Sequence, residues 1–461
     1  MKVFSTIMAL AVTLASIGKV YAADLDKTPP PAAPTSPPCV TGSVFGDPTG
    51  ARADLAAKGL QFQINEIGEV LSDVSGGMRR GTIAENRLET CIDLDLQKLM
   101  GWEGAAIHAN GYWIAGHGLS GNYVGNLMPV SFIEATPTIR LYEAWFEQKF
   151  GDKFALRLGQ LGADSEFITT NYGELFINAS TGWPQIMASD LPSGGPAYPL
   201  ATPAVRFKFT PTDDWAFLLG LFNGDPAAPG PGDPQRRDLH GVDFSVSDPP
   251  LLMGEVQHTY NLDPDAGLAG TVRFGAWDHL GHFDSERFDT LGVPLASPAS
   301  NGIAARLSGD YGIYGVIDQM IYHVPGNDAT KGIGIFARIS GSPNDRNLID
   351  FYADGGINFN GIWAARPNDA FGLAFAYAHI SDAVSAAEQD QIFYSGVQRP
   401  VQDYEAMLEF TYQAQIMQGW TVQPDVQYIF HPGGNVANPF DPTGAVIPNA
   451  WVLAVRTTVN F

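Results

Sequence analysis

The chain has 461 residues and a formal net charge of −23, from 49 acidic and 26 basic side chains. A charge of this sign argues against the basic face that nucleic acids require, so no nucleic acid is expected as a partner. Aromatic residues make up 11% of the chain, with 51 glycines and 33 prolines, and the mean hydropathy is −0.03. After the N-terminus, no run of about 20 apolar residues predicts a membrane-spanning helix.

The N-terminus predicts an exported protein. Lys2 supplies a positive start, residues 7–17 form a short apolar core, and residues 20–22 (Val-Tyr-Ala) form a small-x-small cleavage site. This order is typical of a secretory signal peptide, which we assign to residues 1–22.

Two further segments precede the main body of the chain. Residues 23–45 are Pro-rich and predict an extended linker that cannot build a core. Residues 46–59 predict a short helical segment, which Gly59 ends. The two cysteines, Cys39 and Cys91, could form one disulfide in an exported protein, but their surroundings share no pattern. The sequence leaves this pairing open.

From residue 60 to residue 461 the chain alternates between apolar and polar positions, as strands do. Around residues 87–96, Arg87, Glu89 and Asp93 share one face and apolar side chains the other. Several charges on one strand face require water, which a water-filled barrel lumen supplies. The same alternation recurs at 60–65, 205–209, 215–221, 255–260, 371–378, 404–413 and 420–430.

The connections between these segments differ in length. Residues 415–419 predict a short turn, whereas residues 224–241 and 161–202 predict long loops. Short turns at one end and long loops at the other are typical of bacterial outer-membrane barrels. The stretch 311–322 carries Asp318 among apolar residues of the same parity, and its orientation stays open.

The last eleven residues predict the closing strand of such a barrel. In residues 451–461, apolar and polar side chains alternate up to the terminal Phe461. The barrel-assembly machinery is the expected partner of such a C-terminal aromatic strand. One membrane strand with its turn and loop takes roughly 25 residues, so residues 60–461 have room for about 16 strands. We therefore predict an all-β protein, a transmembrane antiparallel β-barrel of about 16 strands behind a short N-terminal periplasmic segment.

Motifs of catalysis and cofactor binding do not occur in the sequence. It contains no Gly-x-Ser-x-Gly, His-Glu-x-x-His or phosphate-binding loop motif. His279 and His282 lie near Asp278 and Asp284, but a polar loop accounts for them better than a metal site does. We expect no enzyme activity, no cofactor and no metal.

Several longer phrases of this sequence resemble the carbohydrate-selective porins of the OprB type. The resemblance runs from about residue 46 to residue 461 and departs at residues 46–52, where Gly-Asp-Pro-Thr-Gly-Ala-Arg replaces the family's Gly-Asp-Trp-Gly-Gly-Leu-Arg. The phrases are GEVLSDVSGGMRRG (68–81), LGQL (158–161), LPSGGPAYPLATPAVR (191–206), FNGDPAAPGPGDPQRR (222–237), LEFTYQAQ (408–415) and QPDVQYIFHPGGN (423–435).

The resemblance implies a 16-stranded barrel in the bacterial outer membrane, surrounded by lipid and lipopolysaccharide. It implies facilitated diffusion of glucose and other small sugars, without energy coupling. A less selective diffusion porin shares every barrel feature and remains the alternative. Two other classes of barrel protein fit less well. A barrel lipase would need a nucleophile with a base on a lipid-facing strand, and the sequence shows none. A receptor for a large ligand would need a longer chain, with a 22-stranded barrel and a plug. Monomer and homotrimer both remain open.

Candidate lumen residues are charged side chains that lie opposite an apolar strand face. Trp183 is added as a possible stacking residue, because the long segment 161–202 could fold into the pore. The full set is Arg87, Glu89, Asp93, Glu143, Glu147, Arg157, Trp183, Arg206 and Lys208.

Overall fold

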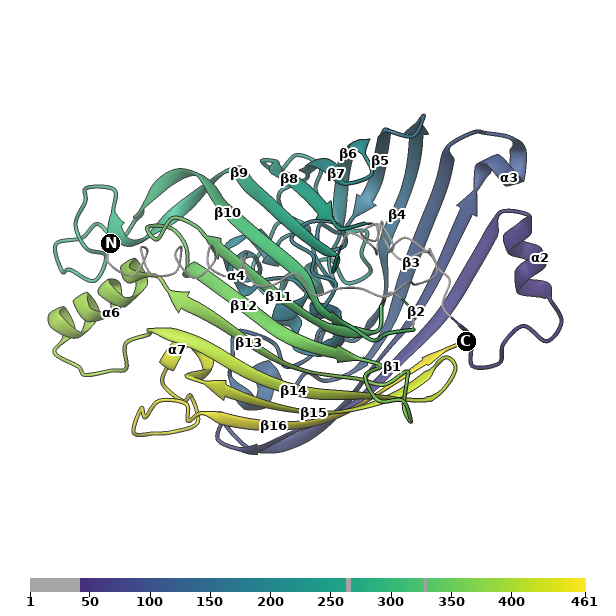
Figure 1. Cartoon of the computed structure of the whole chain (residues 1–461). Coiled ribbons are helices and arrows are strands. Elements are labelled where there is room, and N and C mark those ends of the chain that lie inside the picture. Colours follow the sequence, from purple (N-terminus) through teal and green to yellow (C-terminus); the bar gives the residue numbers. More distant parts are fainter. Residues whose placement is uncertain (1–41, 263–266, 327, 329) are drawn as a thin grey trace.

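The computed structural model describes residues 42–262, 267–326, 328 and 330–461. Within these residues, sixteen antiparallel strands form one closed barrel, in which β16 pairs back with β1 (Figure 1). This confirms the predicted fold class. The predicted signal peptide and most of the Pro-rich linker lie outside the described residues. The strands are β1 (Leu60–Ser75), β2 (Gly81–Asp95), β3 (Ala105–Gly116), β4 (Thr138–Phe150), β5 (Phe154–Leu161), β6 (Thr202–Thr212), β7 (Trp215–Phe222), β8 (Leu251–Tyr260), β9 (Gly270–Asp289), β10 (Ala304–His323), β11 (Gly332–Gly341), β12 (Ile349–Asn360), β13 (Ala370–Ile380), β14 (Tyr404–Met417), β15 (Trp420–Phe430) and β16 (Ala450–Asn460).

Short helices lie mostly at the two ends of the barrel. The helices α2 and α3 and the C-terminus lie at one end, and α6 and α7 at the other (Figure 1). In the described part of the chain, no helix is long and apolar enough to cross a membrane. The α-helices are α2 (Ala51–Ala57), α3 (Leu96–Met100), α4 (Gln185–Asp190), α5 (Pro234–Arg237), α6 (Asp382–Ser395) and α7 (Pro432–Asn435).

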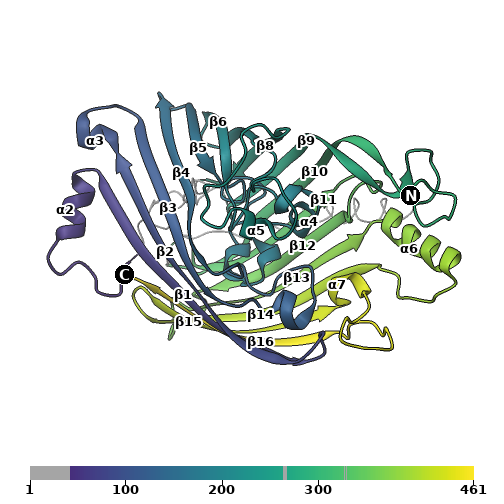
Figure 2. The ribbon, with the colours of Figure 1, turned by 180° about the vertical axis from the view of Figure 1, so that it is seen from behind.

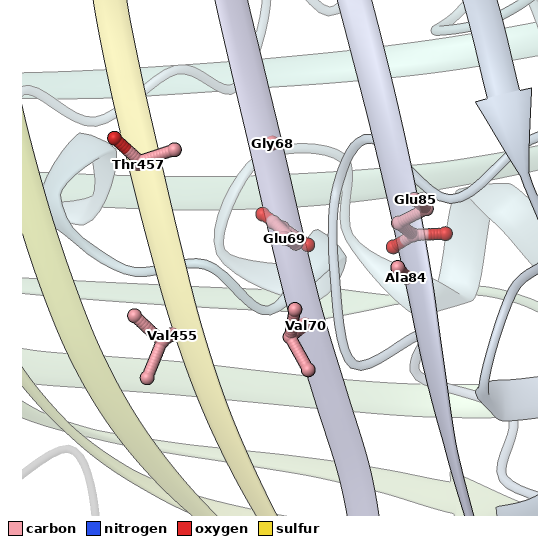
Figure 3. A pocket seen from close by; sticks show the side chains of 7 residues that line it. All are labelled: Gly68, Glu69, Val70, Ala84, Glu85, Val455 and Thr457. Carbon is pink, nitrogen blue, oxygen red and sulfur yellow. The ribbon is translucent and has the colours of Figure 1, made fainter.

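The alternation of the sequence appears as an apolar outer wall and a polar lumen. Val70 of β1 and Val455 of β16 are half exposed on the outer face, whereas Glu69 of β1 and Glu85 of β2 are buried. Figure 3 shows the valines on the near side of the strands and the two glutamates behind them. A shallow groove crosses this outer wall at Gly68, because a glycine there adds no side chain.

Polar contacts stabilise the seam between the first and last strands, both inside the barrel and at its end. Inside, Glu69 of β1 lies opposite Arg456 of β16 and pairs with its guanidinium. At the barrel end, Arg52 of α2 donates to the main-chain oxygens of Phe461 at 2.6 Å and Phe62 at 2.8 Å. The N-terminal helix therefore contacts the last residue of the closing strand.

The two ends of the barrel differ in the length of their connections. Strands β14 and β15 are joined by residues 418–419, where Gly419 adopts a φ of 75° that glycine tolerates best. At the opposite end, two long loops follow β3 and β5. We name them L2 (residues 117–137) and L3 (residues 162–201).

Two expectations from the sequence need correction or completion. The polar loop predicted around His279 is instead part of β9. His279 is buried there, with Nε2 3.1 Å from the Gly224 carbonyl and Nδ1 accepting from Gly281 N. In the stretch that the sequence could not orient, Asp318 faces the lumen on β10, where Arg273 pairs with it at 2.6 Å.

Candidate functional site

The long loop L3 folds into the barrel and packs against its inner wall. Phe176 is 1% exposed, and Figure 2 shows α4 of this loop within the ring of strands. A Cβ at Gly372 of β13 would lie 2.7 Å from the Phe176 ring. Ala374 and Ala376, on the same inward face, are also buried. The inward side chains of β13 are therefore small and apolar, because L3 packs against them.

The loop L2 narrows the lumen from the same end. Its residues Leu119, Val124 and Met128 are fully buried. The carboxylate of Glu405 on β14 accepts hydrogen bonds from the backbone N–H of Leu127 and of Met128, both at 2.7 Å. Two loops thus occupy part of the lumen.

A cavity of about 350 Å³ remains between L3 and the wall formed by β2, β3 and β4. Side chains of both the wall and the loops line it. From the strands, the lining residues are Arg87, Glu89, Cys91, His108, Asn110, Tyr112, Tyr142 and Glu143. From the loops, they are Phe132, Asp164, Ser165, Ala179, Gly182, Trp183 and Tyr198.

Tyrosine rings form one side of this cavity. The ring centre of Tyr112 lies 5.3 Å from those of both Tyr142 and Tyr198. The Arg87 guanidinium lies 4.8 Å from the Tyr112 ring centre and 5.3 Å from that of Tyr198. A cation over aromatic faces is held by the ring quadrupoles, so Arg87 has a defined position with its N–H groups near the cavity.

Acidic groups are set around the same cavity by hydrogen bonds. Asn110 donates to Glu89 at 2.9 Å, and Glu143 accepts from Gly162 N at 2.9 Å. Asp164 of L3 accepts from the Tyr142 hydroxyl at 2.5 Å. Burial raises the pKa of the Asp164 carboxyl, although its hydrogen bonds act in the opposite direction. The cavity therefore offers hydrogen-bonding groups that are already fixed in place.

A cluster of four charges lies beside the cavity. Glu147 and Arg157 interact at 3.1 Å, and Arg206 lies 2.8 Å from Glu147. Glu166 of L3 contacts both arginines, at 3.1 Å and 2.5 Å. Burial alone would raise the pKa of Glu166, but the two arginines outweigh it and lower that pKa. These pairs join L3 to the strands β4, β5 and β6.

The residues predicted from the sequence fall into three groups. Four of them, Arg87, Glu89, Glu143 and Trp183, line the cavity. Glu147, Arg157 and Arg206 belong to the cluster of ion pairs. Asp93 lies further along β2 and accepts a hydrogen bond from His108 of β3. Lys208 of β6 lies half buried beyond the cluster.

The structure also brings Cys91, Asp93 and His108 together, with one ligand-type atom of each within 4.8 Å of the others. The sulfur of Cys91 is disulfide-bonded, however, so it is not a thiolate that could bind a metal. Cys39, the other cysteine of the sequence, lies outside the described residues.

Neither the tyrosines nor the contribution of β3 to the cavity wall was predicted from the sequence. Tyr112 shares its parity with Asn110 and His108 on β3, so the alternation on that strand was a signal for a lumen position. Tyr198 and Asp164 lie in L3, where no period exists to show their direction.

A closed barrel with inward loops and a polar, aromatic constriction is the architecture of a porin, a channel for small hydrophilic solutes. The chain matches the family described as "Carbohydrate-selective porin, OprB family" over residues 79–461, most of its length. It belongs to this family, which confirms the resemblance seen in the sequence.

Known proteins similar to this chain are porins. Porin B of Pseudomonas aeruginosa is 24% identical over 415 residues, covering 85% of this chain and 87% of that protein. The putative porin QuiX of Acinetobacter baylyi is 21% identical over 452 residues, or 91% and 93% of the two chains. The high-pH structure of Pseudomonas putida OprB has the same fold, with a TM-score of 0.79 at 23% identity over 92% of this chain and 99% of that one.

The family and the barrel together assign the cellular role. The protein is a bacterial outer-membrane channel for sugars and thus a transporter.

Proposed function

We propose that the channel passes neutral monosaccharides such as glucose by facilitated diffusion, with the cavity between L3 and strands β2–β4 as its selective site. The observation that carries this proposal is the pairing of rings and polar groups in one cavity. Tyr112, Tyr198 and Trp183 present aromatic surface, which suits the C–H face of a sugar ring. Arg87 and Glu89 lie close by to hydrogen-bond its hydroxyl groups.

The size and charge of the cavity support this substrate class. Its volume of about 350 Å³ lies at the lower end of small-molecule pockets, which range over about 300–1,000 Å³. Its charged lining includes one arginine, Arg87, against the acidic residues Glu89, Glu143 and Asp164. One basic group among three carboxyl groups leaves no surplus of positive charge to attract an anionic sugar, so the lining suits a neutral one.

Weak contacts suit passage through a channel. Each hydrogen bond to a sugar hydroxyl replaces one to water and contributes about 1 kcal/mol net. Several such contacts favour entry without preventing release. The proposed role includes no chemical reaction and no energy coupling.

The test is single-channel conductance in a planar bilayer while glucose is titrated. A saturable fall of the current at millimolar glucose supports a binding site in the pore. An unchanged current with glucose and with a panel of other sugars would instead support the general diffusion porin. A folded protein that forms no channels would refute both.

The remaining partners belong to the same proposal. The apolar outer wall contacts outer-membrane lipid and lipopolysaccharide, and the terminal strand with Phe461 is recognised by the barrel-assembly machinery. The channel works as a monomer or a homotrimer, which chemical cross-linking in detergent distinguishes.

A further inference from the structure

The loop L3 is attached to the barrel wall that lies opposite the sugar cavity. The attached backbone runs from residue 168 to residue 182, and residues 179 and 182 also line the cavity. We call strands β8 to β14 the far wall. We propose that four of its side chains are positioning residues, which fix L3 and thereby set the width of the passage between L3 and strands β2–β4. This inference rests on the proposed sugar site. The four residues are Glu255 on β8, Asp318 on β10, Arg338 on β11 and Glu409 on β14.

Arg338 makes the most direct connection to the cavity. Its Nη1 donates to the Gly182 carbonyl at 2.7 Å, and its Nη2 donates to the Ser180 carbonyl at 2.7 Å. Asp354 of β12 pairs with the same guanidinium, which is 2% exposed. Trp183, the next residue after Gly182, lines the cavity. The planar fork of one buried arginine therefore determines where this part of the lining lies.

Two carboxylates hold the preceding parts of L3. Glu409 accepts from the backbone N–H of Ile177 at 2.6 Å and of Asn178 at 3.3 Å. Asp318 accepts from the Thr170 hydroxyl at 2.5 Å. Hydrogen bonds in a buried site meet no competition from water, so each one holds the backbone group that donates it. The path of the loop is thus set at several points along its length.

The backbone at Ile168 shows that these contacts impose a path on the loop. Its φ is 55°, a left-handed conformation that β-branched residues avoid. Its N–H donates to Glu255 at 2.7 Å, and its carbonyl accepts from Arg338 at 3.0 Å. Strained residues persist where the surroundings fix them. Here both backbone groups of one residue are held by wall side chains.

The inner surface of the far wall fits the loop as well. A Cβ at Gly334 of β11 would lie 2.1 Å from the Tyr172 ring of L3. Phe176 contacts Phe336 with ring centres 5.9 Å apart. The far side of the lumen is therefore filled, and the passage remains on the side of β2–β4.

The test compares Arg338→Lys and Glu409→Gln with the wild type. Lysine keeps the charge opposite Asp354, but its single ammonium lacks the two separate nitrogens with which Arg338 reaches the carbonyls of Gly182 and Ser180. Glutamine keeps the shape of Glu409 but places an NH₂ group where one of its accepting oxygens lies. In each variant L3 loses its fixed position, so the glucose concentration for half-maximal block should rise about tenfold, the equivalent of about one lost contact to the sugar. The conductance without sugar should also become noisier and change in size. Heat-dependent migration on SDS gels shows that each barrel is folded.

Arg346→Lys is the matched control. Its Nη1 donates to the carbonyls of Ser308 at 2.9 Å and Gly309 at 2.6 Å. The substitution therefore changes an arginine contact to two carbonyls of β10 rather than of L3, and the sugar block of this variant should match the wild type. Wild-type block and conductance in both anchor variants, or an equal shift in the control, would overturn the proposal. If glucose blocks no variant, the sugar site fails, and the conductance without sugar still decides whether the anchors position L3.

Discussion

The sharpest prediction for the sugar site is that Arg87→Lys weakens sugar binding while the barrel stays folded. The guanidinium of Arg87 lies 4.8 Å from the ring centre of Tyr112, 5.3 Å from that of Tyr198 and 5.4 Å from that of Phe132. A planar guanidinium stacks on such rings and donates several hydrogen bonds in fixed directions. Lysine keeps the charge but offers a single ammonium on a flexible chain.

The expected size of the effect follows from the contacts that are lost. A hydrogen bond from a charged donor contributes about 1.5–3 kcal/mol. The sugar loses one such bond or has to order the lysine to form it. Since about 1.4 kcal/mol corresponds to a tenfold change in affinity, half-maximal block should need about 10- to 100-fold more glucose.

The assay is the titration of single-channel current with glucose, with Arg79→Lys as the control. Arg79 also lies over two rings, those of Tyr123 at 4.8 Å and Phe440 at 5.1 Å, but it is exposed outside the cavity. Its substitution should leave the sugar block unchanged. A wild-type titration curve for Arg87→Lys would refute the assignment of the cavity as the selective site.

Three further predictions concern the cluster of four charges, the disulfide and the seam between β1 and β16. Because the pKa of Glu166 is lowered in the folded protein, its ion pairs stabilise L3 above the ordinary glutamate pKa of about 4.3. This stabilisation is lost as the pH falls through the lowered pKa, so thermal unfolding should show a step on acidification that Glu166→Gln lacks. Since Cys91 is disulfide-bonded and the sequence has two cysteines, peptide mapping without reductant should find Cys39 linked to Cys91, and two free thiols would contradict this. Arg52→Ala removes the donor to Phe461 and should lower the unfolding free energy by about 1–3 kcal/mol, measured by urea titration in detergent; an unchanged midpoint would contradict it.

Alternation predicted the barrel because most strands contact lipid on one face and water on the other. Leu219 and Leu221 of β7, for example, are exposed on the outer wall as their parity requires. The rule fails where L3 covers the inner face. On β10, Tyr314 and Val316 face inward and are buried. Both faces of this strand therefore carry apolar side chains, and the sequence did not indicate which way Asp318 points. The missing information was the contact between distant parts of the chain.

The candidate site could be predicted only in part, for the same reason. Parity identified Arg87, Glu89 and Glu143 as lumen residues, since each lies opposite an apolar position on its own strand. It could not show which lumen residues lie at the constriction, because this depends on the path of L3. Nor could it show that Arg338, deep in β11, contacts the loop backbone rather than solute.

The two halves of the lumen differ in composition because they serve different contacts. The wall of β2–β4 carries Arg87, Glu89 and Tyr112 toward the cavity, and such groups are suited to contacts with water and sugar. The far wall carries Gly372 and Ala374 with a few buried charges such as Arg338, and these groups are suited to a packed loop. In the proposed arrangement, selectivity depends on both walls, because one contacts the solute and the other determines how far L3 lies from that wall.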